Sequence, residues 1–244
     1  MRFAVFALSS VPDTATTRRL FDLDDLDDKS VSKVLFHRRK QQTGSSEVLR
    51  WDQRAIAALS LIHHSEDKVH LESMHFAAQN EQELLHAFFN AAQGKGRMVF
   101  WGDEHTSIPL VHFRTLKHGI SHPAYWRALN TGKDLHLDIR RYLSPPSDDL
   151  PGLDETARKL GFPGLINRFE DDVLDAWLQG RHADVQAFSD IRVLNTYLIA
   201  LRLFTVTGEL TGDDSAQANE RLLDELGGRN DRHIAEFLSS WGNK

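Results

Sequence analysis

The pattern of hydrophobic and polar positions divides the chain into short apolar stretches, mostly in its first half, and longer helical patterns later. The longest helical pattern lies between His182 and Leu210, where apolar residues recur every three or four positions and no proline intervenes. This spacing is typical of a helix with one buried face, and Gly208 offers a stop. Short apolar stretches bounded by turn residues predict strands at residues 2–8, 54–64, 68–76, 97–101 and 134–139.

Helices are predicted between and after these strands. An amphipathic pattern predicts a helix over Glu81–Gln93, and a second is expected over Ile108–His118, with Ser107 as its N-cap. After a Pro- and Ser-rich loop at residues 144–152, the chain reads as helical: 153–160, 170–178, the long helix, and two short helices near 215–226 and 231–240. Strands first and helices later predict an α/β fold: a mixed five-stranded sheet flanked by helices, with a helical C-terminal part. We expect one domain over residues 1–244, with a helical extension from about 211 to 244.

Two charged runs interrupt this pattern near the N-terminus. Aspartates dominate Asp22–Asp28, and the charge then inverts at His37–Gln42, close to the polar turn Thr43–Ser46. A run of like charges is usually a solvated surface segment. The basic run could also hold phosphates, because it lies beside a flexible turn.

Composition narrows the range of functions. The 244 residues include no cysteine, which excludes disulfides, thiolate zinc sites and cysteine nucleophiles. The net charge of -6 offers no general attraction to nucleic acid, so any such contact needs a local basic patch. Thirteen histidines occur without an HExxH pattern, and no GxSxG elbow is present. The opening apolar run is too short for a signal peptide and no stretch could span a membrane, so we expect a cytoplasmic protein that does not bind membranes.

Four segments stand out as motifs: VFALSSVPD at 5–13, VFWGDEHTSIPLVHFRTLKHGI at 99–120, LDETARKLGFPG at 153–164, and VLNTYL with LRLFTVTGEL at 193–210. In the same order, they resemble motifs of the predicted 3'-5' exonucleases related to the proofreading exonuclease domain of family B DNA polymerases. The resemblance implies a ribonuclease H-like fold, which agrees with the predicted order of strands and helices. It also implies 3'-5' hydrolysis of a nucleic-acid strand by two divalent ions that four acidic side chains hold.

The acidic positions of that family are changed in this sequence. The corresponding residues are Ala7, Ser9, Ser107 and Arg192, and Phe188 stands at the position of the family's tyrosine. The formal charge of the four positions therefore changes from minus four to plus one. Hard cations such as Mg²⁺ need oxygen ligands, mostly carboxylates, and an arginine about 4 Å from a divalent ion is repelled by roughly 8 kcal/mol at an effective dielectric constant of 20. We predict no two-metal hydrolysis, no catalytic residues at these positions and no metal cofactor.

The expected function is that of a catalytically degenerate exonuclease-like protein, a pseudo-exonuclease that still binds single-stranded nucleic acid. Arg192 would contact a backbone phosphate where the family holds metal ions, assisted by Arg38, Arg39 and Lys40. Phe188 or Trp101 would be available to stack on a base. Such binding weakens with salt, because it depends on the release of counterions.

Two alternatives stay open at this stage. The acidic balance and the aspartate-rich run favour a protein–protein scaffold that docks on an active nuclease or polymerase. The chain could instead be an active exonuclease that uses Mg²⁺ or Mn²⁺ with displaced ligands, for which Asp13, Asp103 and Glu104 are the candidates. Glu104 could also form a salt bridge with Arg192, which would replace metal charge by protein charge.

Overall fold

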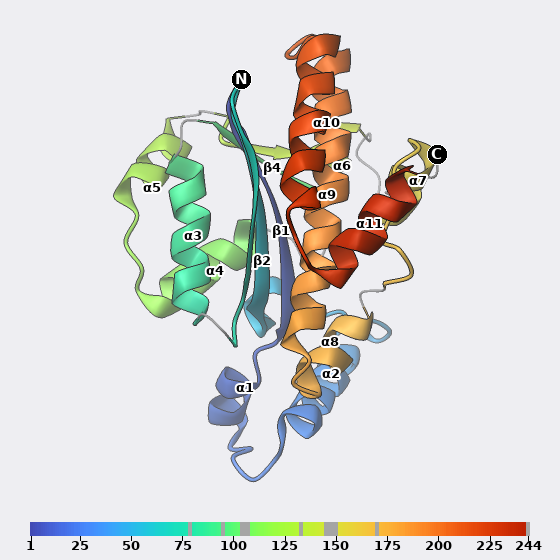
Figure 1. The fold of residues 1–244 in the computed structure, drawn as a ribbon. Coiled ribbons are helices and arrows are strands. Elements are labelled where there is room, and N and C mark those ends of the chain that lie inside the picture. Colours follow the sequence, from blue (N-terminus) through green and yellow to red (C-terminus); the bar gives the residue numbers. More distant parts are fainter. Residues whose placement is uncertain are drawn as a thin grey trace.

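Five strands form one mixed sheet at the centre of the computed structural model, in the order β3-β2-β1-β4-β5 (Figure 1). The structure describes residues 1–77, 80–93, 96–102, 108–131, 134–143, 151–168 and 171–242. The strands are β1 (Phe3–Pro12), β2 (Arg54–His64), β3 (Val69–His75), β4 (Arg97–Phe100) and β5 (His136–Asp138). Strand β1 is antiparallel to β2 and parallel to β4, and β5 is parallel to β4. This arrangement confirms the expected α/β class with a mixed five-stranded sheet, and it is consistent with a ribonuclease H-like fold.

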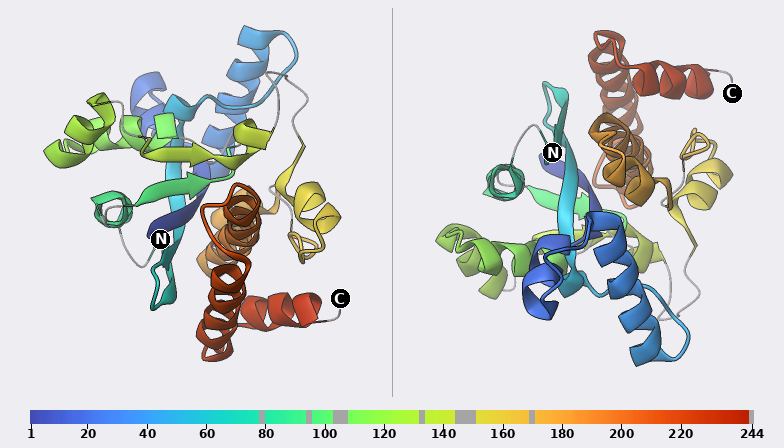
Figure 2. Two further views of the ribbon diagram at one scale, coloured as in Figure 1. Left: turned by 90° about the horizontal axis from the view of Figure 1, so that it is seen from above. Right: turned by 90° about the horizontal axis from the view of Figure 1, so that it is seen from below.

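Apart from α1 and α2, the helices lie in two groups, one on each face of the sheet (Figure 2). Helices α3 and α4 pack against β2 on one face of the sheet. Helix α9 packs against β1 and β2 on the other face. The helices of the described residues are α1 (Thr14–Phe21), α2 (Asp28–Thr43), α3 (Glu81–Gln93), α4 (Ile108–His118), α5 (Pro123–Asn130), α6 (Ile139–Leu143), α7 (Leu153–Lys159), α8 (Asp171–Leu178), α9 (His182–Val206), α10 (Gly212–Gly227) and α11 (Arg232–Gly242), with the short 3-10 helix η1 (Trp51–Gln53).

Alternation along β1 builds a separate hydrophobic core on each face of the sheet. Phe3, Val5 and Ala7 pack into a core with α9 and the C-terminal helices. Phe6 and Leu8 point the other way, into a core with α3 and α4. All ten residues of β1 are buried, which is expected of a central strand that helices cover on both faces.

Helix α9 is more deeply buried than its sequence pattern predicted. The three-to-four spacing indicated one buried face, but the residues from Phe188 to Leu201 are buried all round the helix. The reason is its surroundings, since α9 contacts the sheet and also α7, α8, α10 and α11. The helix ends at Val206, and Gly208 follows with φ of 78°, a conformation that glycine adopts without strain.

The two charged runs form a helical lobe that was not predicted from the sequence. Helices α1 and α2 make up this α1–α2 lobe (residues 14–43), which projects beyond the end of β1 at the bottom of Figure 1. Asp27 caps the N-terminus of α2 by accepting a hydrogen bond from the Ser30 amide at 2.8 Å, and Gly44 ends the helix with φ of 79°. The basic run therefore lies on the last turns of a helix.

None of the helices in the described ranges combines the length and the apolar character that crossing a bilayer would require.

Candidate functional site at the junction of β1 and α9

Small side chains allow β1 and α9 to approach closely where the sequence motifs of both elements meet. Ser9 Oγ donates a hydrogen bond to Ser189 Oγ at 3.4 Å, and Ser189 Oγ donates to the Ala7 carbonyl oxygen at 3.3 Å. The exposed fraction of each of these residues is 3% or less. Directly after Ser9 the pairing of β1 with β2 shifts by one residue, so that Ala57 on β2 is the extra residue of a bulge. The structure therefore places Ala7 and Ser9 against α9.

Arg192 lies at the same junction as a buried cation. It is 3% exposed, and its Nη1 donates a hydrogen bond to the Leu8 carbonyl oxygen at 2.9 Å. The carbon of its guanidinium lies 5.6 Å from the centre of the Phe188 ring, one helical turn earlier. Burial lowers the pKa of Arg192 to about 10, which leaves the group charged at neutral pH. A buried positive charge thus stands beside β1.

Asp190 is the acidic residue closest in sequence to Arg192, but it takes part in a different set of contacts. Ser60 Oγ on β2 donates to Asp190 Oδ1 at 2.5 Å, and His233 Nε2 on α11 lies 2.9 Å from Asp190 Oδ2. Asp190 is 1% exposed, and both of its carboxylate oxygens have a partner. Its role in this arrangement is to anchor α9 to β2 and α11.

Asp13, which follows β1, is held in a buried ion-pair network. Its Oδ1 accepts a hydrogen bond from the Thr16 amide at 3.0 Å, and its Oδ2 contacts Lys117 Nζ at 2.5 Å and Arg114 Nη1. Burial alone would raise the pKa of Asp13, but the hydrogen bond from Lys117, the charge of Arg114 and the Thr16 amide together lower it to about 2. A metal ion that recruited Asp13 would have to replace two cationic partners.

Arg114 joins Asp13 to a second buried acid, Glu81. Arg114 Nε donates to Glu81 Oε1 at 2.7 Å, and its Nη2 pairs with Oε2. Glu81 also accepts a hydrogen bond from the Ile56 amide at 2.8 Å, and His118 Nε2 lies 2.7 Å from its Oε2. The network ties α3 and α4 to the start of β2, and sequence reasoning missed it because its members are far apart in the chain.

Three candidate residues lie outside the described residues. These are Ser107, Asp103 and Glu104, so the salt bridge between Glu104 and Arg192 and the displaced metal site both stay predictions. Among the residues that the structure does describe, no three His, Cys, Asp or Glu side chains are grouped so that they could hold a metal ion.

Trp101 and Arg192, which were predicted to bind a strand, are both inside the protein. Trp101 is 2% exposed and belongs to the core beneath α9. A nucleic-acid strand could contact either residue only if the side chains that cover it moved away. The role of Trp101 and Arg192 in nucleic-acid binding stays a prediction.

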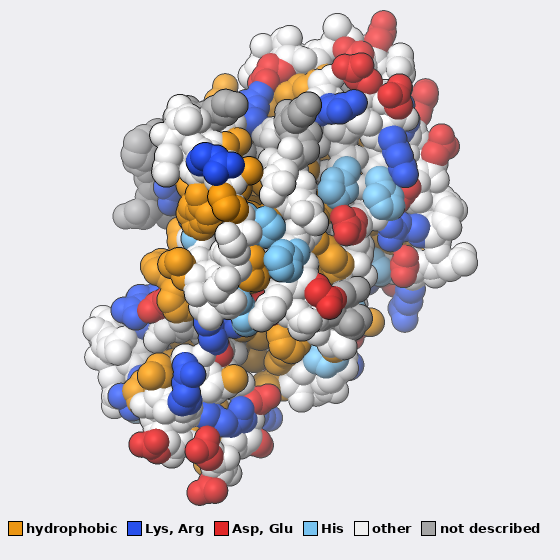
Figure 3. Space-filling model, turned by 90° about the vertical axis from the view of Figure 1, so that its left-hand side faces the viewer, with side chains coloured by type: hydrophobic (Ala, Val, Ile, Leu, Met, Phe, Trp, Pro, Cys, Tyr) orange, Lys and Arg blue, Asp and Glu red, His pale blue; other side chains and the backbone are white. Residues whose placement is uncertain are grey.

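The basic run, in contrast, lies on the surface of the α1–α2 lobe, away from Arg192. Arg38 and Lys40 are exposed and Arg39 is half-buried. The guanidinium of Arg38 lies over the Phe21 ring at 3.9 Å from its centre. Figure 3 shows Lys and Arg side chains gathered on this lower lobe, above carboxylates at its tip. The predicted nucleic-acid-binding residues are therefore divided between a buried junction and an exposed helix.

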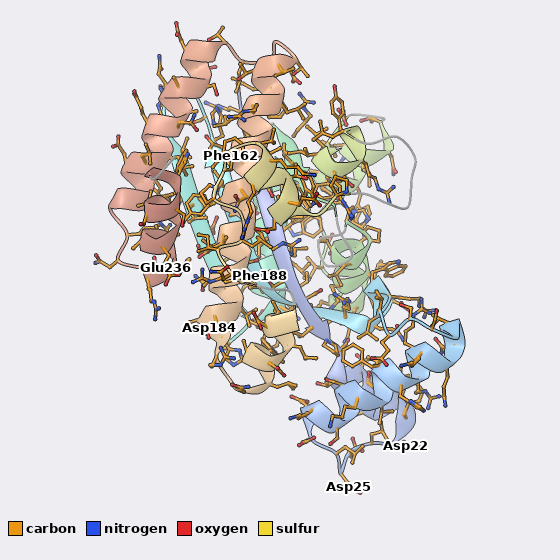
Figure 4. All side chains as sticks on the ribbon, turned by 90° about the vertical axis from the view of Figure 1, so that its right-hand side faces the viewer. Asp22, Asp25, Phe162, Asp184, Phe188 and Glu236 are labelled. Atoms are coloured by element: carbon orange, nitrogen blue, oxygen red, sulfur yellow. The ribbon has the colours of Figure 1, made fainter. Side chains whose placement is uncertain are left out.

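A cleft beside Phe188 was not predicted from the sequence. It has a volume of about 840 Å³ and lies between α8, the first turns of α9 and α11 (Figure 4). Its lining is mixed in charge. Arg168 Nη2 lies 2.7 Å from Glu236 Oε2 on α11, and Arg181 pairs with Asp184 three residues later at the start of α9. No local motif could have indicated this cleft, because three separate helices form it.

Comparison with known families agrees with the sequence motifs. A family model described as a predicted 3'-5' exonuclease related to the exonuclease domain of PolB matches residues 46–241, which is most of the chain. Strand β1, with Ala7 and Ser9, precedes the matched range. Searches of curated proteins and of solved structures found no match.

Proposed function

The chain belongs to the family of predicted 3'-5' exonucleases related to the exonuclease domain of PolB, and on this premise we propose that it is a catalytically degenerate member that binds single-stranded nucleic acid without cutting it. The family supplies the expectation of an exonuclease-like protein and of a nucleic-acid ligand. The loss of hydrolysis is our inference from the side chains between β1 and α9.

The observation that carries the proposal is the donor set at that junction. A two-metal reaction needs carboxylate oxygens that clamp both ions. Among the described residues, the junction instead contains the hydroxyls of Ser9 and Ser189 and the guanidinium of Arg192, which donates to the Leu8 carbonyl oxygen. These groups do not fit a pair of divalent cations, because the hydroxyls are neutral and the guanidinium repels an ion about 4 Å away by roughly 8 kcal/mol at an effective dielectric constant of 20. We therefore derive no metal-dependent step for this chain.

We infer that the protein still binds a nucleic-acid strand from its family and from its exposed basic residues. The chain as a whole carries a net charge of -6, so attraction to a polyanion must be local. Helix α2 offers such a place with Arg38, Arg39 and Lys40 on its last turns. The alternative of a protein–protein scaffold becomes the better explanation if no strand is retained.

The test is an assay in which cutting and binding are read from the same samples. A single strand labelled at its 5' end is incubated with the purified protein and Mg²⁺ or Mn²⁺, and portions are run on native and denaturing gels. We expect slower migration on the native gel, weaker at high salt, and an unshortened strand on the denaturing gel. A ladder of shortened strands that EDTA suppresses, and that Asp103→Asn or Glu104→Gln abolishes, would establish displaced ligands and overturn the loss of hydrolysis.

A further inference from the structure

Trp51 is an exposed aromatic side chain on the segment that follows the basic end of α2. It is 44% exposed, whereas the other four tryptophans of the chain, all within the described residues, are buried or half-buried. Its ring packs edge-on against Phe113 of α4, with 5.4 Å between the ring centres. The contact with Phe113 holds the indole in place at the surface.

The segment between α2 and Trp51 is ordered by its own hydrogen bonds. Thr43 Oγ1 donates to the Ser46 carbonyl oxygen at 2.7 Å and accepts from the Ser46 amide at 2.9 Å. Arg39 Nε donates to the Val48 carbonyl oxygen at 2.9 Å, which fixes this guanidinium against the chain three residues before Trp51. The segment therefore keeps a defined conformation without a ligand. This reduces the conformational entropy that would be lost when a ligand binds.

The charge of this surface is opposite to that of the whole chain. Between His37 and Gln53 the sequence has four basic residues and two acidic ones, against a net charge of -6 overall. Lys40 pairs with Glu47 at 2.9 Å, and more than half of each side chain is exposed. An exposed pair of this kind is weak, so a phosphate group can compete with Glu47 for Lys40.

We propose that Trp51, Arg39 and Lys40 form the binding surface for single-stranded nucleic acid, with a base stacked on the indole and the backbone phosphates next to the two cations. Aromatic side chains beside a basic track are how proteins hold single strands without reading their sequence. This proposal rests on the proposed function, and it moves the stacking role from the buried Trp101 to Trp51. Arg38 is left out because its guanidinium lies over Phe21.

Charge variants with a matched control test the phosphate contacts. The ligands are oligo(dT) and oligo(rU) of equal length, and the dissociation constant is measured by fluorescence anisotropy at several salt concentrations. The slope of log K against log salt is negative, and neutralising two phosphate contacts on a single strand should reduce its magnitude by about 1.4. We expect this of Arg39→Gln/Lys40→Gln. The control is Arg158→Gln/Lys159→Gln on α7, an adjacent Arg-Lys pair whose members each pair with a carboxylate four residues earlier. It changes the net charge equally and should leave the slope unchanged.

Aromatic variants test the stacking contact. Trp51→Leu should raise the dissociation constant by roughly five- to 150-fold, the range for loss of one stacked base, and Trp51→Phe should restore part of the affinity. Binding should quench the tryptophan fluorescence of the wild-type protein, and this quenching should disappear in Trp51→Phe while anisotropy still reports binding. The fluorescence readout does not depend on how Trp51→Leu affects folding.

The outcomes separate this proposal from the one on which it rests. A wild-type protein that binds neither oligonucleotide ends the proposal of strand binding altogether. Binding that the Trp51 and Arg39/Lys40 variants retain at wild-type strength and salt slope shows that a strand is held elsewhere, which overturns the assignment of this surface and leaves the proposed function standing. A difference between oligo(dT) and oligo(rU) identifies the natural strand as DNA or RNA.

Discussion

Substitution of Asp13 by asparagine distinguishes a structural acid from a displaced metal ligand. In the structure Asp13 contacts Arg114 and Lys117, and it accepts the Thr16 amide hydrogen. These contacts lower its pKa from 3.8 to about 2. A shift of this size is equivalent to about 2 kcal/mol of folding free energy. Because the folded-state pKa is the lower one, the stabilisation is complete above the unfolded-state pKa and is lost as the pH falls through the folded-state value.

The measurement is urea unfolding of the wild-type protein and Asp13→Asn across the pH range, with and without Mg²⁺. We expect the variant to be less stable by about 2 kcal/mol at neutral pH, and the difference to fall to roughly half near pH 3. Asp67→Asn, in the exposed turn between β2 and β3, should change little. A metal ligand would behave differently, since Mg²⁺ would then stabilise the wild-type protein and not the variant. Such selective stabilisation, or a variant as stable as the wild type without metal, would refute the structural role.

Three further outcomes follow from the same structure. Arg192→Asp should lower the unfolding free energy by about 3 kcal/mol or more, because it buries an uncompensated carboxylate. Addition of Mn²⁺ should not restore the stability, because the facing side chains of β1 carry no charge and cannot help to bind the ion. Burial lowers the pKa of His64 to about 4, so the unfolded chain binds more protons than the folded protein between pH 6.5 and 4. As the pH falls through this window, urea unfolding should show that the free energy of unfolding of the wild type decreases by roughly 3 kcal/mol more than that of His64→Gln. Ser60→Ala removes the hydrogen bond to the buried Asp190 and should cost about 1–3 kcal/mol in the same assay, and a cost near zero would show that Asp190 finds another donor.

Local signals predicted the sheet and several helices well. The strand at 54–64 and the helices at 81–93 and 108–118 have the expected bounds, because apolar runs, turn residues and amphipathic spacing act over a few residues. Strand β1 is longer than predicted and continues to Pro12 through the bulge after Ser9. Helix α2 was missed because its charges hid its pattern, although Val31 and Leu35 are buried at helical spacing and Asp27 caps it. The evidence for that helix was present in the sequence and was read as surface charge alone.

The sequence motifs indicated that residues of the first strand and the long helix would lie together, but not whether they would be exposed. Sequence motifs indicated that Ser9 and Arg192 would come together, and both lie at the junction of β1 and α9. Whether such residues face solvent depends on the elements that pack around them, which no local pattern encodes. Trp101 and Trp51 show this clearly: both are tryptophans that follow or begin a short element, yet one is 2% exposed and the other 44%.

We propose that Arg192, at a position where the sequence motifs imply an acid, allows the junction to be stable without ions. Two carboxylates that face each other across a strand and a helix repel one another unless a cation lies between them. In this chain the helix itself provides the cation, and the guanidinium reaches the backbone of β1 at the Leu8 carbonyl oxygen. Because the β1 side chains are neutral, the attraction is a charge-assisted hydrogen bond to a carbonyl, which is stronger than a neutral one. Arg192 thereby joins α9 directly to the backbone of β1.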